Sequence, residues 1–207
     1  KSAFMTYRRK ERGDCTDFTD EEYKSAHRNQ PPGCPKLSIL SFNKGFYGRT
    51  FGALTTTHTK PLYKIDFPAF DWPFAPFPIY KYPLKDNESE NQQQDEKCLA
   101  AVEDLIATWK KKGNPVAGVF VEPIQAEGGD LHASSNFFKC LQQITKKHNA
   151  YFVLDEVQTG CGTTGKFWAH EHWCLECPPD AVTFSKRMQA CGYFHTEELR
   201  PNVPWRI

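Results

Sequence analysis

The segment YFVLDEVQTG, residues 151–160, is the most informative part of the sequence about the fold. Its first part, residues 151–154, is an unbroken apolar run, and this run stops at Asp155. A strand with one solvated face alternates apolar and polar residues, whereas a strand buried on both faces reads as a continuous apolar run. The stretch therefore predicts a central strand of a largely parallel sheet, with a carboxylate at its carboxyl end.

Two further apolar runs end in a similar way. Val116–Val121 stops at Glu122, and Ala181–Phe184 leads through Ser185 to Lys186. In open α/β sheets, ligands bind outside the carboxyl ends of the strands. We therefore expect an active site where these strand ends meet, and the pattern indicates an enzyme.

The segments between these runs carry helical periodicity. Apolar residues recur at helical spacing over residues 99–109, and basic residues followed by Gly113 end that helix. A second helix is expected to begin near Ser134 or Ser135 and to end at Lys147. Residues 37–42 read as another strand. Strands that alternate with helices predict an α/β fold, in which a mostly parallel sheet is flanked by helices on both faces.

The remaining segments read as a lead-in, a loop and a connection. Residues 2–12 look helical, and residues 14–35 read as a loop with a short acidic helical turn. The segment 61–83 holds six of the fifteen prolines among many aromatic residues. This composition excludes a regular helix or a central strand, and it favours an ordered covering loop over a polyproline recognition motif. Residues 85–97 are charged and Gln-rich, so an exposed connection is expected there.

Composition narrows the kind of partner. The 207 residues carry a formal net charge of +1, so no polycationic surface indicates a nucleic acid or a membrane, and a small molecule is favoured. No apolar run approaches the roughly 18 residues that a membrane span requires. Eight cysteines without a framework spacing make a reducing compartment the default. The chain begins with Lys1 rather than methionine, and we expect a fragment of a longer protein.

Asp155 and Lys186 together suit a pyridine cofactor. A lysine can form a Schiff base with an aldehyde cofactor, and pyridoxal phosphate also needs an acid opposite its ring nitrogen. A carboxylate about 4 Å from a pyridinium contributes roughly 4 kcal/mol at an effective dielectric near 20, which is about three pK units. From spacing alone, however, a surface salt bridge or a capping role is the more common fate of such a pair.

Longer motifs add to this reading, because they resemble the successive signatures of the class III pyridoxal-phosphate aminotransferases. The motifs are ILSF (39–42), FYGRT (46–50), VEPIQAEGGD (121–130), LDEVQTG (154–160) and TFSK (183–186). FDWP (70–73), GKFWAHEHW (165–173) and RPN (200–202) are most similar to members that act on 4-aminobutyrate. The resemblance implies fold type I of the pyridoxal-phosphate-dependent transferases. Residues 1–36 would be a helical and loop lead-in of the large domain, and residues 37–207 its incomplete cofactor-binding core, without the small domain.

The resemblance implies roles around the cofactor, pyridoxal 5'-phosphate. Lys186 would be the catalytic Schiff-base lysine and would move the proton between substrate and cofactor. Asp155 would pair with the ring nitrogen, and Gln158 would hydrogen-bond the phenolic oxygen. Phe46 and Tyr47 would pack on the ring face. The family usually has histidine at the second of these positions, but stacking needs only a flat π surface.

The resemblance also implies roles toward the substrate. Arg49 would hold the carboxylate of 4-aminobutyrate in a bidentate grip. Glu127 would neutralise a second substrate-binding arginine that the C-terminal part of the full protein supplies. Glu122 would support the region of Gln158. The implied reaction transfers an amino group from 4-aminobutyrate to 2-oxoglutarate and yields succinate semialdehyde and glutamate, in a homodimer of the mitochondrial matrix.

Each of these roles has a simpler rival. Arg49 could pair with an acid at the surface, Glu122 and Glu127 could be solvated loop residues, and Phe46 with Tyr47 could be ordinary core. A truncated, catalytically inactive chain and an aminotransferase for another ω-amino acid are the rival functions.

Two other motifs resemble sites of different chemistry; we reject the first, a phosphate loop, and keep the second only as a minor hypothesis. GCGTTGK (160–166) fits a phosphate loop as far as its lysine, but Phe167 stands where a Ser or Thr hydroxyl must meet magnesium. A zinc site remains a minor hypothesis, on the ligand types His170, His172, Cys174 and Cys177. We expect no metal at the active site.

Overall fold

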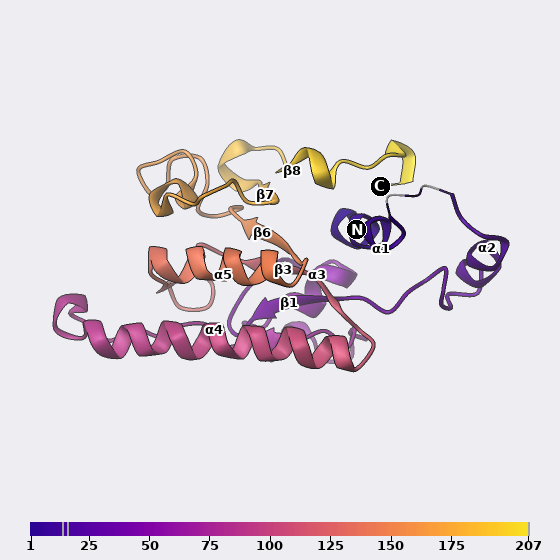
Figure 1. Ribbon diagram of the computed structural model, residues 1–207. Helices are drawn as coiled ribbons and strands as arrows, with labels where there is room; N and C mark the ends of the chain where they lie inside the picture. Colours follow the sequence, from indigo (N-terminus) through magenta and orange to yellow (C-terminus); the bar gives the residue numbers. More distant parts are fainter. Residues whose placement is uncertain (14, 16, 207) are drawn as a thin grey trace.

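The computed structural model describes residues 1–13, 15 and 17–206. Asp14 and Thr16 of the predicted loop, and Ile207 at the end of the predicted core, lie outside the described residues. Six strands form one sheet of order β2-β1-β3-β6-β7-β8 (Figure 1). The strands are β1 (Ser38–Phe42), β2 (Phe74–Ala75), β3 (Val116–Val121), β6 (Tyr151–Asp155), β7 (Ala181–Phe184) and β8 (Gly192–His195). A hairpin of β4 (Ile124–Gln125) and β5 (Leu131–His132) follows β3.

The sheet is mostly parallel, as predicted. β1 pairs in parallel with β2 and β3, β3 with β6, and β6 with β7, whereas β8 returns antiparallel at the edge. The three apolar runs 116–121, 151–154 and 181–184 all lie in strands, which confirms the prediction for them. Because the runs are parallel neighbours, their carboxyl ends share one edge of the sheet.

Helices account for most of the remaining regular structure in the described residues. The α-helices are α1 (Ser2–Glu11), α2 (Asp20–Ala26), α3 (Phe51–Thr56), α4 (Glu88–Lys111) and α5 (Ser135–Lys147). Short 3₁₀ turns are η1 (Pro61–Tyr63), η2 (Leu84–Asp86), η3 (Ala169–Trp173), η4 (Lys186–Met188), η5 (Glu197–Leu199) and η6 (Pro204–Arg206). Among these described helices, none has the length and apolar content needed to cross a bilayer.

Both faces of the sheet are buried, which explains the unbroken apolar runs. Phe152 and Leu154 point into the larger core, which α4 and α5 cover where they run side by side (Figure 1). Tyr151 and Val153 alternate with them and pack on the other face, in a smaller cluster with Ala3 of α1. Helices on both faces were predicted, and the two clusters confirm them.

The prediction of an exposed connection at 85–97 is wrong, because α4 begins at Glu88. The polar residues of this first part are not all solvated. Asn91 is buried and exchanges two hydrogen bonds with the backbone of Lys81, at 2.8 and 3.0 Å. Asp95 is also buried and accepts hydrogen bonds from Tyr80 and Ser134. A helix face that is buried through polar groups leaves no apolar periodicity in the sequence.

The proline-rich segment 61–83 contains no regular α-helix and no central strand, as predicted. It contributes η1 and β2, and β2 lies at the edge of the sheet. Its rings pack on one another and on the core: Phe70 stacks on Trp72 with ring centroids 4.8 Å apart, and Phe77 is buried. The Trp72 indole N–H donates to the carbonyl of Leu37, which ties the segment to the start of β1.

Candidate active site

The carboxyl edge of the sheet gathers the three residues that the strand ends predicted. Asp155 is the last residue of β6, Glu122 directly follows β3, and Lys186 follows β7 after one intervening residue. The strand register fixes their order, because Val121 pairs with Leu154 and Asp155 pairs with Thr183. Two carboxylates and one amine therefore lie on neighbouring strands at the same edge.

Lys186 sits on a constrained turn. Its φ of 36° lies in the left-handed region, which non-glycine residues adopt at an energetic cost and which is enriched at functional sites. Its Nζ donates a 2.8 Å hydrogen bond to Oε1 of Gln158, and Arg187 donates from Nη1 to the carbonyl of Gln158 at 2.9 Å. The turn after β7 is thereby tied to the turn after β6.

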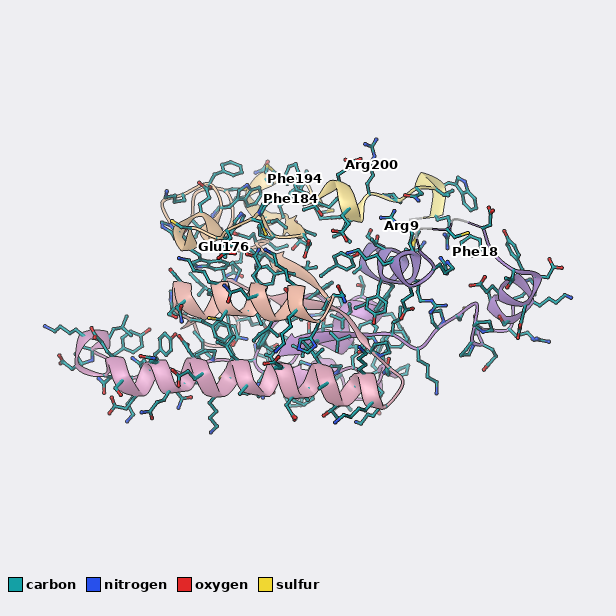
Figure 2. All side chains as sticks on the ribbon, in the orientation of Figure 1. Arg9, Phe18, Glu176, Phe184, Phe194 and Arg200 are labelled. Atoms are coloured by element: carbon teal, nitrogen blue, oxygen red, sulfur yellow. The ribbon has the colours of Figure 1, made fainter. Side chains whose placement is uncertain are left out.

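Ring packing holds the base of that turn. Phe184 is the last residue of β7, and its ring lies 5.0 Å from the ring of Phe194 on β8; Figure 2 shows the two side chains next to each other. Gly192 pairs with Phe184 in the register, and a Cβ at Gly192 would come within 2.7 Å of the Phe184 ring. The absent side chain of Gly192 therefore leaves room for the ring that precedes Lys186.

Asp155 is a desolvated carboxylate. Burial raises the pKa of Asp155, although the N–H of Val157, which donates to Oδ1 at 3.0 Å, and the charge of Lys186 work in the opposite direction. Among the residues that the structure describes, no Lys, Arg or His nitrogen lies within 4 Å of this carboxylate. Asp155 is half-buried, and a desolvated anion with no cation within 4 Å has an electrostatic preference for a positively charged ligand.

Glu122 is the buried carboxylate that directly follows β3. It is 6% exposed, and its Oε2 accepts a 2.9 Å hydrogen bond from the backbone N–H of Phe46. Burial raises the pKa of Glu122 to about 8, and the charges of Asp155 and Glu127 add to the rise, whereas Phe46 N–H and Lys186 oppose it. The predicted partner region of Glu122 was that of Gln158, but its hydrogen bond goes to the loop after β1.

The neighbouring rings of Phe46 and Tyr47 have different surroundings. The Phe46 ring lies edge-on to Tyr63, with centroids 6.2 Å apart. The Tyr47 ring folds against Gly45, where a Cβ would lie 2.6 Å from the phenol oxygen. Burial, and then the charges of Glu122 and Asp155, raise the pKa of Tyr47 well above its ordinary value. Of the two predicted ring-face residues, Phe46 therefore contacts Glu122 through its backbone, and Tyr47 lies close enough to Glu122 and Asp155 for their charges to raise its pKa.

The Tyr47 hydroxyl is buried without a hydrogen-bond partner of good geometry among the described residues. Buried polar atoms are nearly always paired in native structures, so an exception often marks a place that a ligand or solvent completes. The backbone N–H of Tyr47 is fixed by a 2.9 Å hydrogen bond to Thr57 Oγ1. The hydroxyl faces the backbone of Phe42 and Glu122 without closing a well-formed hydrogen bond, and it belongs to a residue whose own backbone is fixed.

Arg49 and Glu127 meet through a residue that the sequence did not single out. The guanidinium of Arg49 lies 4.1 Å from the centroid of the Tyr63 ring, and the Tyr63 hydroxyl donates a 2.8 Å hydrogen bond to Oε1 of Glu127. Lys60 Nζ is 3.6 Å from the same Glu127 oxygen. Tyr63 lies in the proline-rich segment among many other rings, and no signal in the sequence separates it from them.

Loop contacts fix this group relative to the sheet. Gln125 is fully buried and donates from Nε2 to the carbonyl of Asn43 at 2.9 Å. Gly128 lies so close to Lys44 that a Cβ would come within 2.3 Å of its carbonyl oxygen. The hairpin that carries Glu127 is therefore held against the loop that leads to Arg49, and a side chain at position 128 would force the two apart.

A buried carboxylate that the sequence analysis missed organises the glycine-rich loop after β6. The Glu156 side chain is 0% exposed, and it accepts hydrogen bonds from Thr159 Oγ1, from the backbone N–H groups of Ala169 and His170, and from His170 Nδ1 at 2.8 Å. Burial works to raise the pKa of Glu156, but these hydrogen bonds outweigh it and lower the pKa. Glu156 thus closes the loop 156–170 beside Gln158.

The candidate zinc ligands have other partners. His170 Nδ1 is bound to Glu156, and His172 Nε2 lies 2.9 Å from the carbonyl of Thr164. Within the described part of the chain, no group of three or more His, Cys, Asp or Glu side chains is arranged to hold a metal ion. The structure gives the two histidines roles in packing the loop.

Known proteins share this fold and much of this sequence. A lysine aminotransferase from M. tuberculosis superposes with a TM-score of 0.75 at 29% identity, over 96% of this chain and 40% of that one. The family model for aminotransferase class-III matches residues 1–207. Proteins described as 4-aminobutyrate aminotransferase are 58% identical in Sus scrofa, where the protein is described as mitochondrial, and 57% identical in Emericella nidulans. The chain spans 41% of the length of each of these two relatives.

The fold and the candidate site indicate a broad class of enzymes, and the family model identifies the family within that class. A mostly parallel sheet flanked by helices, shared with a solved aminotransferase, is the large-domain architecture of the fold type I pyridoxal-phosphate transferases. The chain belongs to the class III aminotransferase family, whose members use pyridoxal phosphate.

Proposed function

We propose that the protein to which this chain belongs transfers the amino group of 4-aminobutyrate to 2-oxoglutarate and so yields succinate semialdehyde and glutamate. Relatives described as 4-aminobutyrate aminotransferases are 52–58% identical over the whole chain, from animals, fungi and a slime mould. The observation that supports the proposal is that a desolvated carboxylate, Asp155, and an amine, Lys186, follow one another on neighbouring parallel strands at the same edge of the sheet.

The residues present fit pyridoxal phosphate. Asp155 is desolvated and lacks a close cation, which suits a protonated pyridine nitrogen, and Lys186 supplies an amine at the same edge. When bound, the cofactor acts as an electron sink for the bond that breaks at the substrate carbon. Lys186 would hold the cofactor and then move the proton at Nζ, while Asp155 would keep the ring nitrogen protonated.

Three further residues would complete the cofactor side. Gln158 Oε1 lies 2.8 Å from Lys186 Nζ, which supports a role for its amide near the phenolic oxygen of the cofactor. Phe46 and Tyr47 would cover the ring face, and the unpartnered Tyr47 hydroxyl offers a polar atom beside it. Glu122 would support this region indirectly, through its hydrogen bond to the Phe46 backbone.

Arg49 and Glu127 would serve the substrate. Among the residues that the structure describes, the Arg49 guanidinium has no carboxylate within 4 Å, so it is available for the substrate carboxylate in a bidentate grip. Glu127 would neutralise a second arginine from the C-terminal part of the full protein. We propose residues 1–36 as the lead-in, residues 37–207 as the cofactor-binding core, a homodimeric assembly, and a location in the mitochondrial matrix. The names of the animal relatives describe those proteins as mitochondrial.

The experiment is absorbance spectroscopy on purified protein incubated with pyridoxal phosphate. A near-visible band that survives gel filtration, is absent in Lys186→Ala and remains in Lys166→Ala supports the proposal, since Lys166 is an exposed lysine of the glycine-rich loop. Addition of 4-aminobutyrate should bleach this band, and 2-oxoglutarate should restore it. Bleaching only by another ω-amino acid would change the substrate, and absence of the band would indicate an inactive chain.

A further inference from the structure

Tyr63 separates the two charged side chains that are proposed to serve the substrate. The Arg49 guanidinium lies over the face of its ring at 4.1 Å, and the Glu127 carboxylate binds the hydroxyl at the far end of the same ring at 2.8 Å. The Phe46 ring lies 5.9 Å from the guanidinium and adds a second aromatic surface. One phenol therefore holds a cation on its face and an anion at its edge.

Stacking leaves the binding edge of the arginine free. A guanidinium that packs on an aromatic face keeps its five N–H donors in the plane of the group, where they can meet a carboxylate in a bidentate fashion. In the described residues, Arg49 makes no ion pair with Glu127 or with any other carboxylate. The N–H donors of Arg49 are therefore available to bind a substrate carboxylate.

The hydroxyl of Tyr63 gives Glu127 a different partner. A hydrogen bond to a carboxylate is stronger than one between neutral groups, and Lys60 adds a cation 3.6 Å from the same oxygen. If the hydroxyl were absent, Glu127 would keep only Lys60 as a partner, and the Arg49 guanidinium could then compete for its carboxylate. Their pairing would cancel the charge that a substrate carboxylate needs.

The backbone of Tyr63 is itself anchored, so its ring is a fixed wall. The N–H of Tyr63 donates to the carbonyl of Lys60 at 3.1 Å within η1. The next residue, Lys64, donates from Nζ to the carbonyls of Thr55 and Thr57 at 3.1 and 3.0 Å, which ties the turn to the end of α3. The same α3 begins directly after the loop that carries Arg49.

We propose that Tyr63 is a positioning and specificity-determining residue. Its ring orients Arg49, and its hydroxyl keeps Glu127 away from Arg49. The site would therefore select amines that carry a carboxylate over amines that lack one. This inference rests on the proposed function, because it assigns Arg49 to the substrate carboxylate. Tyr63 would act through Arg49 and Glu127, and it would not contact the reacting atoms directly.

The test measures binding of butyrate, a carboxylate of the length of the proposed substrate, by NMR titration of the purified protein. Tyr63→Leu removes both functions of the ring and should weaken butyrate binding about tenfold. Tyr63→Phe keeps the stack and loses the hydroxyl, and should weaken binding about threefold. Tyr63→Phe combined with Glu127→Gln should regain the affinity of the Glu127→Gln protein, because the competing anion is gone. Tyr23→Leu, at an exposed tyrosine of α2, is the matched control and should bind as the unchanged protein does.

Rescue by Glu127→Gln is the outcome that a merely structural role for Tyr63 would not produce. The inference is overturned if Tyr63→Leu binds butyrate normally, if Glu127→Gln fails to restore binding to Tyr63→Phe, or if the unchanged protein binds butyrate no better than butanamide. The cofactor band is recorded on the same samples. A normal band with no effect of Tyr63 removes the inference alone, whereas the predicted butyrate pattern without any band removes the cofactor proposal and leaves the role of Tyr63 standing.

Discussion

The amine of Lys186 donates a 2.8 Å hydrogen bond to the side-chain amide oxygen of Gln158, and this bond joins the turns that follow two neighbouring parallel strands. Lys186 follows β7, whereas Gln158 follows β6 just after Asp155. A lysine that is held by an amide, on a turn with a left-handed backbone, starts from one defined orientation. The site on this edge is therefore organised before any ligand binds, which lowers the entropic cost of binding one.

Asp155→Asn should stabilise the cofactor-free protein and weaken its binding of the cofactor. Burial raises the pKa of Asp155, so the carboxylate is costly in the cofactor-free protein, and an isosteric amide should raise the melting temperature. The same change removes the anion opposite a protonated pyridine nitrogen, and should lower the affinity for pyridoxal phosphate at least about tenfold. Thermal melts without cofactor and absorbance titrations with it check the two effects. An Asp155→Asn protein that melts earlier and binds the cofactor normally would show that Asp155 has only a structural role.

Glu122→Gln should change the pH dependence of stability in a definite direction. The folded pKa of Glu122 is raised to about 8 from an ordinary value of 4.5, so between these values the folded protein binds more protons than the unfolded chain. Stability from this group is therefore lost as the pH rises from 4.5 to 8, at no more than about 1.4 kcal/mol per pH unit. Urea unfolding over this range should give a flatter profile for Glu122→Gln and an unchanged profile for Glu90→Gln, at an exposed glutamate of α4. Equal slopes for the Glu122→Gln and unchanged proteins would rule out the protonated, buried carboxyl.

His170→Ala should destabilise the glycine-rich loop far more than His172→Ala. The Glu156 side chain is fully buried, and His170→Ala removes the ring donor from a buried carboxylate that keeps three other donors, at a cost of about 1.5–3 kcal/mol. His172 makes one exposed hydrogen bond to Thr164, worth about 1 kcal/mol or less. Because the folded pKa of Glu156 is lowered, its contribution is present above pH 4.5 and is lost as the pH falls further, and His170→Ala should reduce this acid-side loss. Equal unfolding free energies for the two alanine variants would contradict the role of the buried pair.

Sequence reasoning identified those parts of the fold that depend on apolar burial. The runs 116–121, 151–154 and 181–184 are strands because each is covered on both faces, and burial on both faces is visible as an unbroken apolar string. The start of α5 was equally visible, since Ser134 accepts the N–H of Phe137 as an N-cap. The first half of α4 was missed because Asn91 and Asp95 are buried through hydrogen bonds.

The residues of the candidate site likewise fall into those that the sequence could reveal and those that it could not. Asp155 and Lys186 could be found because they terminate apolar runs, and the structure places both at one edge of the sheet. Glu156 and Tyr63 could not be found, because their importance lies in partners distant along the chain: His170 for Glu156, and Arg49 with Glu127 for Tyr63. Spacing in a sequence reports neighbours on one element, whereas these contacts are made between loops that only the folded sheet brings together.

Borohydride trapping followed by peptide mass spectrometry determines whether Lys186 holds pyridoxal phosphate opposite Asp155. The protein is incubated with the cofactor, reduced, digested and mapped. We expect one dominant cofactor-modified peptide, carrying the modification on Lys186, whose yield falls in Asp155→Asn and is unaffected in Lys166→Ala. Modification spread over exposed lysines, or a Lys186 yield that does not depend on Asp155, would show that these two residues do not hold the cofactor together.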